Sequence, residues 1–271
     1  ALASFFLRRC KHVFARGAGT AKNLQDLGLP QDHWSQAADV AMLYRPSFTL
    51  SNENQTRFSE LTEKLDTLRS QGKTVVALSP SILVMEKSRN EGIPYGQLFS
   101  GMVNHLSQRN IHPVFLPNAT REGSSSTRNN DILVIEEIRS ICRDQLSAEV
   151  LASVDWVDYD INTRSVRELI SRSDVLLTSR FHAMVSGLAL GVPTLVVGWS
   201  HKYMETLADF GMDHLAFDFR SPGEDLGAMV DEILEKKEAF QSQILSKLPS
   251  VRQSSSSQFK YVKDFLHCYR E

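Results

Sequence analysis

The segment Ser179-Arg180-Phe181-His182 combines residue types that can hold a small anion and protonate it. Apolar residues 175–178 predict a buried strand before it, and residues 181–190 predict an apolar helix that starts within it. The N-terminus of a helix offers free N–H groups and partial positive charge to an anion. Arg180 adds a guanidinium fork that suits phosphate or carboxylate, and His182 can transfer a proton near neutral pH. The structural alternative is that Arg180 pairs with a nearby acid and that His182 caps the helix.

Polar residues also follow other predicted strands, at the edge where open parallel sheets bind their ligands. Lys202 opens the helix after strand 193–199, and a lysine in a first turn opposes the helix dipole. This placement indicates a ligand or a carboxylate partner, and the alternative is an ordinary solvated lysine. Asn118 and Ser79 closely follow two further strands, so both could hydrogen-bond a ligand, although Ser and Asn also favour turns.

Arg16 precedes two closely spaced glycines, Gly17 and Gly19, between a predicted strand and a predicted helix. This order is similar to a dinucleotide-binding turn, but the third glycine and a clearly placed acidic ribose partner are missing. We therefore expect a flexible turn with Thr20 as the helix N-cap rather than a nucleotide site. The sequence contains no motif of a P-loop, a zinc protease or a serine hydrolase, so these chemistries gain little support.

Strands that alternate with helices must position these residues. Between about residues 73 and 250 the strands are continuous apolar runs, as in a parallel sheet covered on both faces. This pattern predicts a Rossmann-like α/β domain, with Gly191 and Gly211 ending two of its helices. The predicted strands are 74–78, 114–116, 155–159, 175–178 and 193–199. The predicted helices are 95–106, 131–146, 166–170, 181–190, 202–210 and 226–234, with a polar loop at 123–127.

The segments that flank this domain have different patterns. Residues 1–50 contain a helix, a strand and a second helix, which predicts the C-terminal end of an N-terminal α/β domain. Apolar residues 1–7 predict that the first helix has a buried face. Residues 51–72 predict a linker and a helix between the two domains. The serine run 254–257 predicts a loop before a C-terminal helix, within the segment 251–271.

The bulk composition is that of an ordinary globular protein, with 42% hydrophobic and 23% charged residues. A net charge of −2 predicts no broad attraction to nucleic acid or to anionic membranes. No apolar stretch approaches the ~20 residues of a membrane span. Cys10, Cys142 and Cys268 are far apart and lack metal-ligand spacing, so we expect reduced thiols in a cytoplasmic protein and no bound metal.

The stretch Asp174–Ala183, followed by Ala189–Pro193, closely resembles the polysaccharide pyruvyl transferase family. That family carries a strand, then S-R-[LF]-H-A, then a helix of small residues that ends in G-V-P. Lys202 matches a lysine beyond the family's next strand, and Arg16 and Asp39 match an arginine and an aspartate upstream. The resemblance runs from about residue 10 to about residue 215.

The resemblance implies a two-domain fold of the GT-B type and transfer of pyruvate from phosphoenolpyruvate to sugar hydroxyls, which forms a ketal. It implies that Arg180 and His182 hold the donor, that the Phe181 backbone N–H contributes, and that His182 is the candidate general acid. Family members often have a histidine where this chain has Asn118, and they begin with an N-x-G-D segment that this sequence lacks. We therefore expect a chain that carries half of an active site.

Phosphoenolpyruvate is the implied donor substrate, with no further cofactor, and a glycan or lipid-linked oligosaccharide is the implied acceptor. Two alternatives stay open beside this interpretation. One is a GT-B-type glycosyltransferase that uses a nucleotide sugar, because the same helix N-terminus could hold a diphosphate. The other is a truncated, non-catalytic module that binds an anion. Binding of phosphoenolpyruvate rather than a nucleotide sugar separates the two enzymes, and release of phosphate with a glycan separates an enzyme from the binding module.

Overall fold

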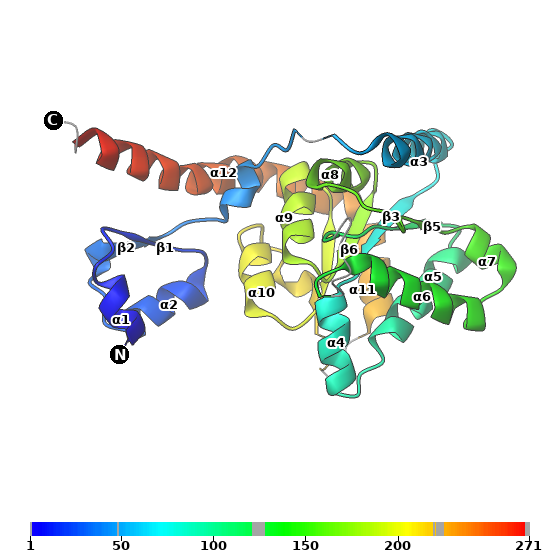
Figure 1. The fold of residues 1–271 in the computed structure, drawn as a ribbon, viewed down its shortest axis with the longest axis horizontal. Coiled ribbons are helices and arrows are strands. Elements are labelled where there is room, and N and C mark those ends of the chain that lie inside the picture. Colours follow the sequence, from blue (N-terminus) through cyan, green and yellow to red (C-terminus); the bar gives the residue numbers. More distant parts are fainter. Residues whose placement is uncertain (1, 48, 121–127, 219, 221–224, 269–271) are drawn as a thin grey trace.

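A computed structural model describes residues 2–47, 49–120, 128–218, 220 and 225–268 of the chain (Figure 1). The strands of the larger sheet are β3 (Val75–Ser79), β4 (His112–Phe115), β5 (Asp155–Trp156), β6 (Val175–Thr178), β7 (Thr194–Val197) and β8 (Ala216–Phe217). Within the described ranges these six strands pair in parallel in the order β5-β4-β3-β6-β7-β8. This confirms the Rossmann-like sheet predicted from the sequence. The polar loop expected at 123–127 lies outside the described residues.

Helices cover both faces of this sheet (Figure 1). They are α3 (Asn52–Ser70), α4 (Ile82–Asn90), α5 (Tyr95–Gln108), α6 (Asp131–Gln145), α7 (Ala148–Ala152), α8 (Thr163–Ser171), α9 (Phe181–Leu190), α10 (His201–Ala208), α11 (Leu226–Glu235) and α12 (Lys237–Cys268). Side chains alternate along each strand, so that Val76 and Leu78 enter one apolar core while Val75 and Ala77 enter another. Helices α3 and α8 fill the second core, and α4, α5, α6, α9, α10, α11 and α12 fill the first.

The N-terminal residues form a small unit of their own. It contains α1 (Leu2–Leu7), β1 (Val13–Ala15), α2 (Ala18–Asp26), β2 (Trp34–Gln36) and the 3-10 helix η1 (Gln31–His33). The next 3-10 helix, η2 (Val40–Leu43), instead packs Met42 into the first core of the larger sheet. Strands β1 and β2 pair in parallel around a small core that includes Leu24 and Trp34. The helix-strand-helix order was predicted, whereas β2 was not, because its three residues include only one buried side chain.

Two expectations for this unit were wrong. Helix α1 has no buried residue, and Leu2 and Phe6 are 73% and 59% exposed, because within the described residues only Leu7 of this helix packs against the small core. The N-cap of α2 is Gly17 rather than Thr20. The Gly17 backbone has a φ of 143°, a conformation that glycine adopts without strain because it has no Cβ atom.

Helix α12 corrects the prediction at the other end of the chain. It runs without a break through the serine run 254–257 and through the boundary expected after residue 250, and it reaches the N-terminal unit (Figure 1). The Ala38 N–H donates to the Ser254 hydroxyl at 3.0 Å, and the Ser255 hydroxyl donates to the Asp39 carbonyl at 2.9 Å. Two of the four serines thus have tertiary partners for their hydroxyls, a contribution that local propensity does not contain, while Ser256 and Ser257 donate to carbonyls one turn earlier in the helix.

The segment 51–72, expected to hold a linker and a helix, is almost entirely helix α3. This helix packs Phe58 and Leu65 onto the sheet, so it belongs to the second core. Within the described residues, no helix combines the length and the apolar character that are needed to cross a membrane.

Helix α9 lies unusually close to the sheet because Gly187 faces β7. A Cβ atom at Gly187 would lie 2.4 Å from Thr194 Oγ1 and 2.9 Å from Leu176 Cδ2. The helix then ends at Gly191, whose φ of 77° confirms the predicted left-handed cap. These two glycines fix the height and the end of the helix whose first residues are Phe181 and His182.

We predict that Gly187→Ala destabilises the protein by about 1–3 kcal/mol, because the added methyl forces α9 away from the sheet. The matched control is Gly101→Ala, in the middle of the exposed face of α5, where an added Cβ meets nothing within 4 Å. That change should stabilise the protein by about 0.4–1 kcal/mol. Urea unfolding measures both values, and equal effects of the two substitutions would contradict the close packing of α9.

Candidate functional site

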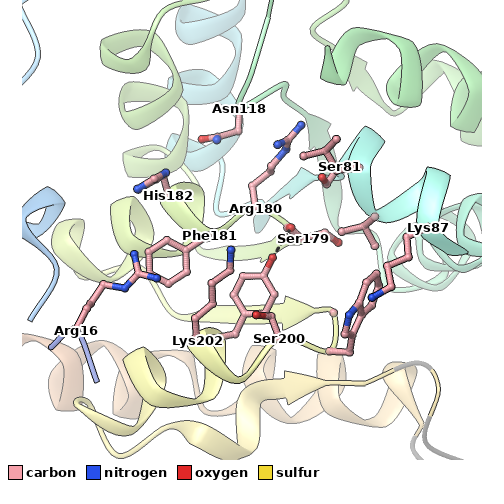
Figure 2. A pocket seen from close by; sticks show the side chains of 15 residues that line it. Arg16, Ser81, Lys87, Asn118, Ser179, Arg180, Phe181, His182, Ser200 and Lys202 are labelled. Atoms are coloured by element: carbon pink, nitrogen blue, oxygen red, sulfur yellow. Dashed lines mark hydrogen bonds between the residues drawn. The ribbon is translucent and has the colours of Figure 1, made fainter. Parts of the chain in front are cut away.

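A cavity of about 430 Å³ opens beyond the carboxyl ends of β3, β6 and β7 (Figure 2). Its walls come from the loops after these strands, from α4, and from Arg16 of the N-terminal unit. The fifteen lining residues include five basic or histidine side chains and no acidic one. They are Arg16, Ser81, Leu83, Val84, Lys87, Asn118, Ser179, Arg180, Phe181, His182, Gly198, Trp199, Ser200, Lys202 and Tyr203.

The Arg180 side chain is held in the cavity wall by two residues that precede or begin α6. Its Nε atom donates to Asp131 Oδ1 at 3.0 Å, its Nη2 atom makes an ion pair with the same oxygen, and its Nη1 atom donates to Asn129 Oδ1 at 2.7 Å. The acid partner that the sequence left as an alternative is therefore present. Within the described part of the chain these bonds use three of the five guanidinium N–H groups, which leaves two for a ligand.

Asp131 joins three loops at the edge of the sheet. Its carboxylate is fully buried, and besides Arg180 it accepts from the backbone N–H groups of Ile82 at 3.1 Å and Ala119 at 2.9 Å. The Asn118 N–H donates to Asp131 Oδ2 at 3.3 Å, the same oxygen that accepts from Ala119. The backbone of Asn118 is thus tied to Asp131 while the residue lines the cavity. The sequence placed Asp131 only at the start of a predicted helix. The one signal that could have identified it is that a buried arginine generally needs an acidic partner.

The N-terminus of α9 faces the cavity without a side-chain cap. Arg180 is the N-cap residue and makes no capping hydrogen bond, and the first bond of the helix runs from the Met184 N–H to the Arg180 carbonyl. His182 is exposed and does not cap the helix, and its ring packs edge-on against Phe181 at 5.3 Å between centroids. Because the first N–H groups of a helix lack intrahelical partners, this end of α9 can bind an anion.

Two further cations lie over the ring of Phe181. The guanidinium carbon of Arg16 is 4.3 Å from the ring centroid and Lys202 Nζ is 5.2 Å from it. Arg16 is paired with Asp39 at 2.9 Å, whereas Lys202 has no carboxylate partner among the residues that the structure describes. Burial lowers the pKa of the Lys202 ammonium, and the neighbouring charges of Arg16 and Arg180 lower it further. This electrostatic crowding favours an anionic ligand.

The two predicted serines have different surroundings. The Ser179 hydroxyl lies at the cavity wall and accepts from the Tyr95 hydroxyl at 2.6 Å, while the Tyr203 hydroxyl donates to the Ser179 carbonyl at 2.9 Å. Burial raises the pKa of Tyr95, so its hydroxyl stays protonated. Ser79 is fully buried and is not among the lining residues, because Ser81 occupies the cavity wall two positions later.

Sequence reasoning missed several lining residues. Ser81 belongs to a loop that the strand-end rule had already selected. Ser200 and Tyr203 lie within two positions of Lys202, so the same rule could have found them. Lys87 lies on α4, a helix whose apolar residues are confined to its first four positions, 82–85. Its sequence therefore gave no periodic signal for a helix.

The glycines after Arg16 make room for a side chain of the same chain. The Gly19 N–H donates to Glu205 Oε1 of α10 at 2.9 Å, so Glu205 occupies the N-terminus of α2. A Cβ atom at Gly17 or Gly19 would lie 2.1 or 2.3 Å from a Glu205 carboxylate oxygen. This contact holds the N-terminal unit against α10 and places Arg16 beside the cavity.

We predict that Asp131→Asn destabilises the protein by about 3–5 kcal/mol, because the amide removes the charge that balances buried Arg180 and turns one acceptor into a donor. Asp66→Asn is the matched control, since Asp66 also pairs with an arginine but is 56% exposed. It should cost less than about 1 kcal/mol. Chemical denaturation measures the free energy of unfolding of both variants. If Asp131→Asn lowers it as little as the control does, Asp131 does not hold the three loops of the site together.

Three solved structures share the fold at low sequence identity. A UDP-GlcNAc 2-epimerase from Neisseria meningitidis bound to UDP-GlcNAc has a TM-score of 0.57 at 12% identity over 97% of this chain and 63% of that one. An α,α-trehalose-phosphate synthase from Burkholderia vietnamiensis has a TM-score of 0.59 at 11% identity, over 98% and 64%. The S. aureus protein MnaA with UDP has 0.59 at 11%, over 97% and 61%.

These likenesses establish a GT-B-like fold, and the chain spans less than two thirds of the length of these structures. No curated protein matches the sequence significantly. The family model described as polysaccharide pyruvyl transferase matches residues 2–201, a range that holds the N-terminal unit, Asp131 and the Ser-Arg-Phe-His segment. Because that match covers well over half of the sequence, the chain belongs to the polysaccharide pyruvyl transferase family.

Proposed function

We propose that this chain carries the donor site of an enzyme that transfers pyruvate from phosphoenolpyruvate to hydroxyls of a glycan sugar and forms a ketal. The observation that carries the proposal is the cavity itself, in which Arg180, Lys202 and Arg16 converge beside an uncapped helix N-terminus and no lining residue is acidic. Phosphoenolpyruvate bears a phosphate and a carboxylate on three carbons. Such a compact, multiply charged donor suits several cations in a small volume.

The two anionic groups of the donor need different partners. The free N–H groups of Arg180 and of the first turn of α9 can bind oxygen atoms with fixed geometry, as a phosphate or carboxylate requires. Lys202 and Arg16, which both lie close to the Phe181 ring, add further positive charge. Asn118 and Ser179 supply polar atoms at the wall without adding negative charge. We therefore assign these residues to donor binding.

His182 is our candidate general acid. A proton delivered to the methylene carbon C3 makes C2 cationic, and a sugar hydroxyl then attacks C2 and loses its proton. The C2–O bond to phosphate then breaks and inorganic phosphate leaves. A second hydroxyl of the same sugar attacks C2 and closes the ketal, and its proton leaves with the phosphate. The imidazole lies at the cavity wall, exposed, with its ring orientation supported by Phe181. Because the imidazole is exposed, water can return a proton to it between turnovers.

We predict that His182→Asn keeps most donor affinity and loses about 10²–10⁴-fold in turnover, because the helix N-terminus still binds the anion while proton delivery is lost. Calorimetric titration with phosphoenolpyruvate gives the affinity, and phosphate release with a glycan acceptor gives the rate. The control is His201→Asn at the exposed start of α10, outside the cavity lining, which should change neither value. An unaffected rate in His182→Asn would assign the acid elsewhere, and binding of UDP-glucose in place of phosphoenolpyruvate would reject the proposed reaction.

We predict a loss of donor affinity on the alkaline side that depends on Lys202. Because its pKa is lowered by burial and by Arg16 and Arg180, Lys202 loses its charge at a lower pH than an ordinary lysine does. Anion affinity is therefore full below this pKa and falls as pH rises through it. Lys202→Arg stays charged and should remove the decline, whereas Lys202→Met should weaken binding even near pH 7. Titrations from about pH 7 to pH 10 test this, and an alkaline decline retained in Lys202→Arg would contradict it.

A further inference from the structure

The cavity has a second end that the donor residues do not occupy. Figure 2 shows Lys87 on the opposite side of the cavity from Arg16 and His182, with Lys202 between them. Lys87 extends from the last turn of α4, and its Nζ atom lies 4.3 Å from the ring centroid of Trp199 in the loop after β7. This end, the Lys87–Trp199 end, is part of the same cavity as the N-terminus of α9.

Lys87 differs from the other basic residue of its helix turn. Arg89, two positions later, makes an ion pair with Glu137 of α6 and does not line the cavity. Lys87 lines the cavity and makes no ion pair with a carboxylate in the described part of the chain. The Lys87 ammonium instead lies over the face of the Trp199 ring. A cation–π contact of this kind is weak, so the ammonium can leave it to form an ion pair with an anion. Lys87 is therefore a cation available to a ligand.

The surroundings of Lys87 are aromatic and apolar, in contrast to the donor end. Trp199 is half-buried, Val84 is buried, and Leu83 is 43% exposed at the cavity wall. Flat aromatic and aliphatic surface suits the C–H face of a sugar ring, while the nearby Ser81 and Ser200 offer polar atoms to its edge. A small dianionic donor does not need such a surface. The Lys87–Trp199 end combines a ring-sized apolar wall with two cations near the indole. Arg220, 5.2 Å from the Trp199 ring centroid, is paired with Asp218, whereas Lys87 lines the cavity.

We propose that the Lys87–Trp199 end binds the acceptor, and that this acceptor is a saccharide with an anionic substituent, such as a phosphate ester, close to the sugar ring. The inference rests on the proposed function, since it places the acceptor in the same cavity as phosphoenolpyruvate. Trp199 would contact the ring face, and Lys87 would leave its position over the indole to pair with the anion. Selection then depends on charge as well as on sugar shape.

The test titrates the whole chain with glucose 1-phosphate, glucuronate and neutral methyl glucoside, each with and without saturating phosphoenolpyruvate. Quenching of tryptophan fluorescence reports binding locally, because Trp156 stacks on Phe115 and Trp34 is buried in the N-terminal unit. Glucose 1-phosphate should bind in the presence of the donor, and the neutral glucoside should bind at least about tenfold more weakly. Glucuronate distinguishes a general carboxylate site from a phosphate site. The signal should disappear in Trp199→Phe.

Lys87→Met should weaken glucose 1-phosphate binding by about tenfold or more and leave phosphoenolpyruvate affinity within about threefold. Arg89→Met is the matched control, since it removes a cation from the same helix turn outside the cavity, and it should change neither affinity. Retained donor binding by Lys87→Met shows that the variant is folded. Three results would overturn the inference. Glucose 1-phosphate could compete with phosphoenolpyruvate for binding, its affinity could be unchanged in Lys87→Met, or UDP could displace it from the cavity.

The outcomes for the donor and for the acceptor are separate. If phosphoenolpyruvate does not bind to the unchanged protein, the proposed function fails. The titrations without donor still decide whether the Lys87–Trp199 end takes an anionic saccharide. If phosphoenolpyruvate binds and glucose 1-phosphate binds no better than the neutral glucoside, the donor site stands and the acceptor inference fails.

Discussion

A carboxylate without any contact with solvent must receive hydrogen bonds and a balancing charge, and the geometry of this site follows from that need at Asp131. Arg180 provides the charge, and three backbone N–H groups provide further donors. These groups belong to the loops after β3, β4 and β6, so one side chain fixes the mutual positions of three strand ends. Arg180 consequently meets a ligand as a preorganised group, with little side-chain entropy left to lose.

The cavity is an assembly of like charges that the protein balances only in part. Arg180 is paired with Asp131, and Arg16 is paired with Asp39. Lys202, whose pKa is lowered by both arginines, makes no ion pair with a carboxylate among the described residues. These like charges repel one another, and a bound anion would relieve that repulsion. A cluster of like charges lowers stability, so such clusters are expected at ligand-binding sites rather than in regions with a purely structural role.

Much of the fold could be predicted because buried parallel strands are visible as continuous apolar runs, and the Ser179–His182 segment was located from its position after such a run. What could not be predicted depends on tertiary contacts. Helix α4 has a mixed sequence after its first turn, so Lys87 had no predicted element to carry it. In the helical serine run of α12, two hydroxyls bond to Ala38 and Asp39, more than 200 residues away. The sequence predicted that an acidic residue could pair with Arg180, but it did not identify that residue as Asp131.

The contact between Glu205 and the two glycines after Arg16 couples three positions that are far apart in the sequence. A Cβ atom at Gly17 or Gly19 would collide with the Glu205 carboxylate, and the φ of Gly17 excludes most other residues in any case. In evolutionary terms, an alanine at position 19 would force the flexible Glu205 side chain to move and would end its hydrogen bond to the backbone N–H of residue 19, so it is tolerated more easily where the side chain at position 205 is shorter. Among related sequences, these positions should accordingly vary as a linked set, and their joint variation would record the docking of the N-terminal unit on α10.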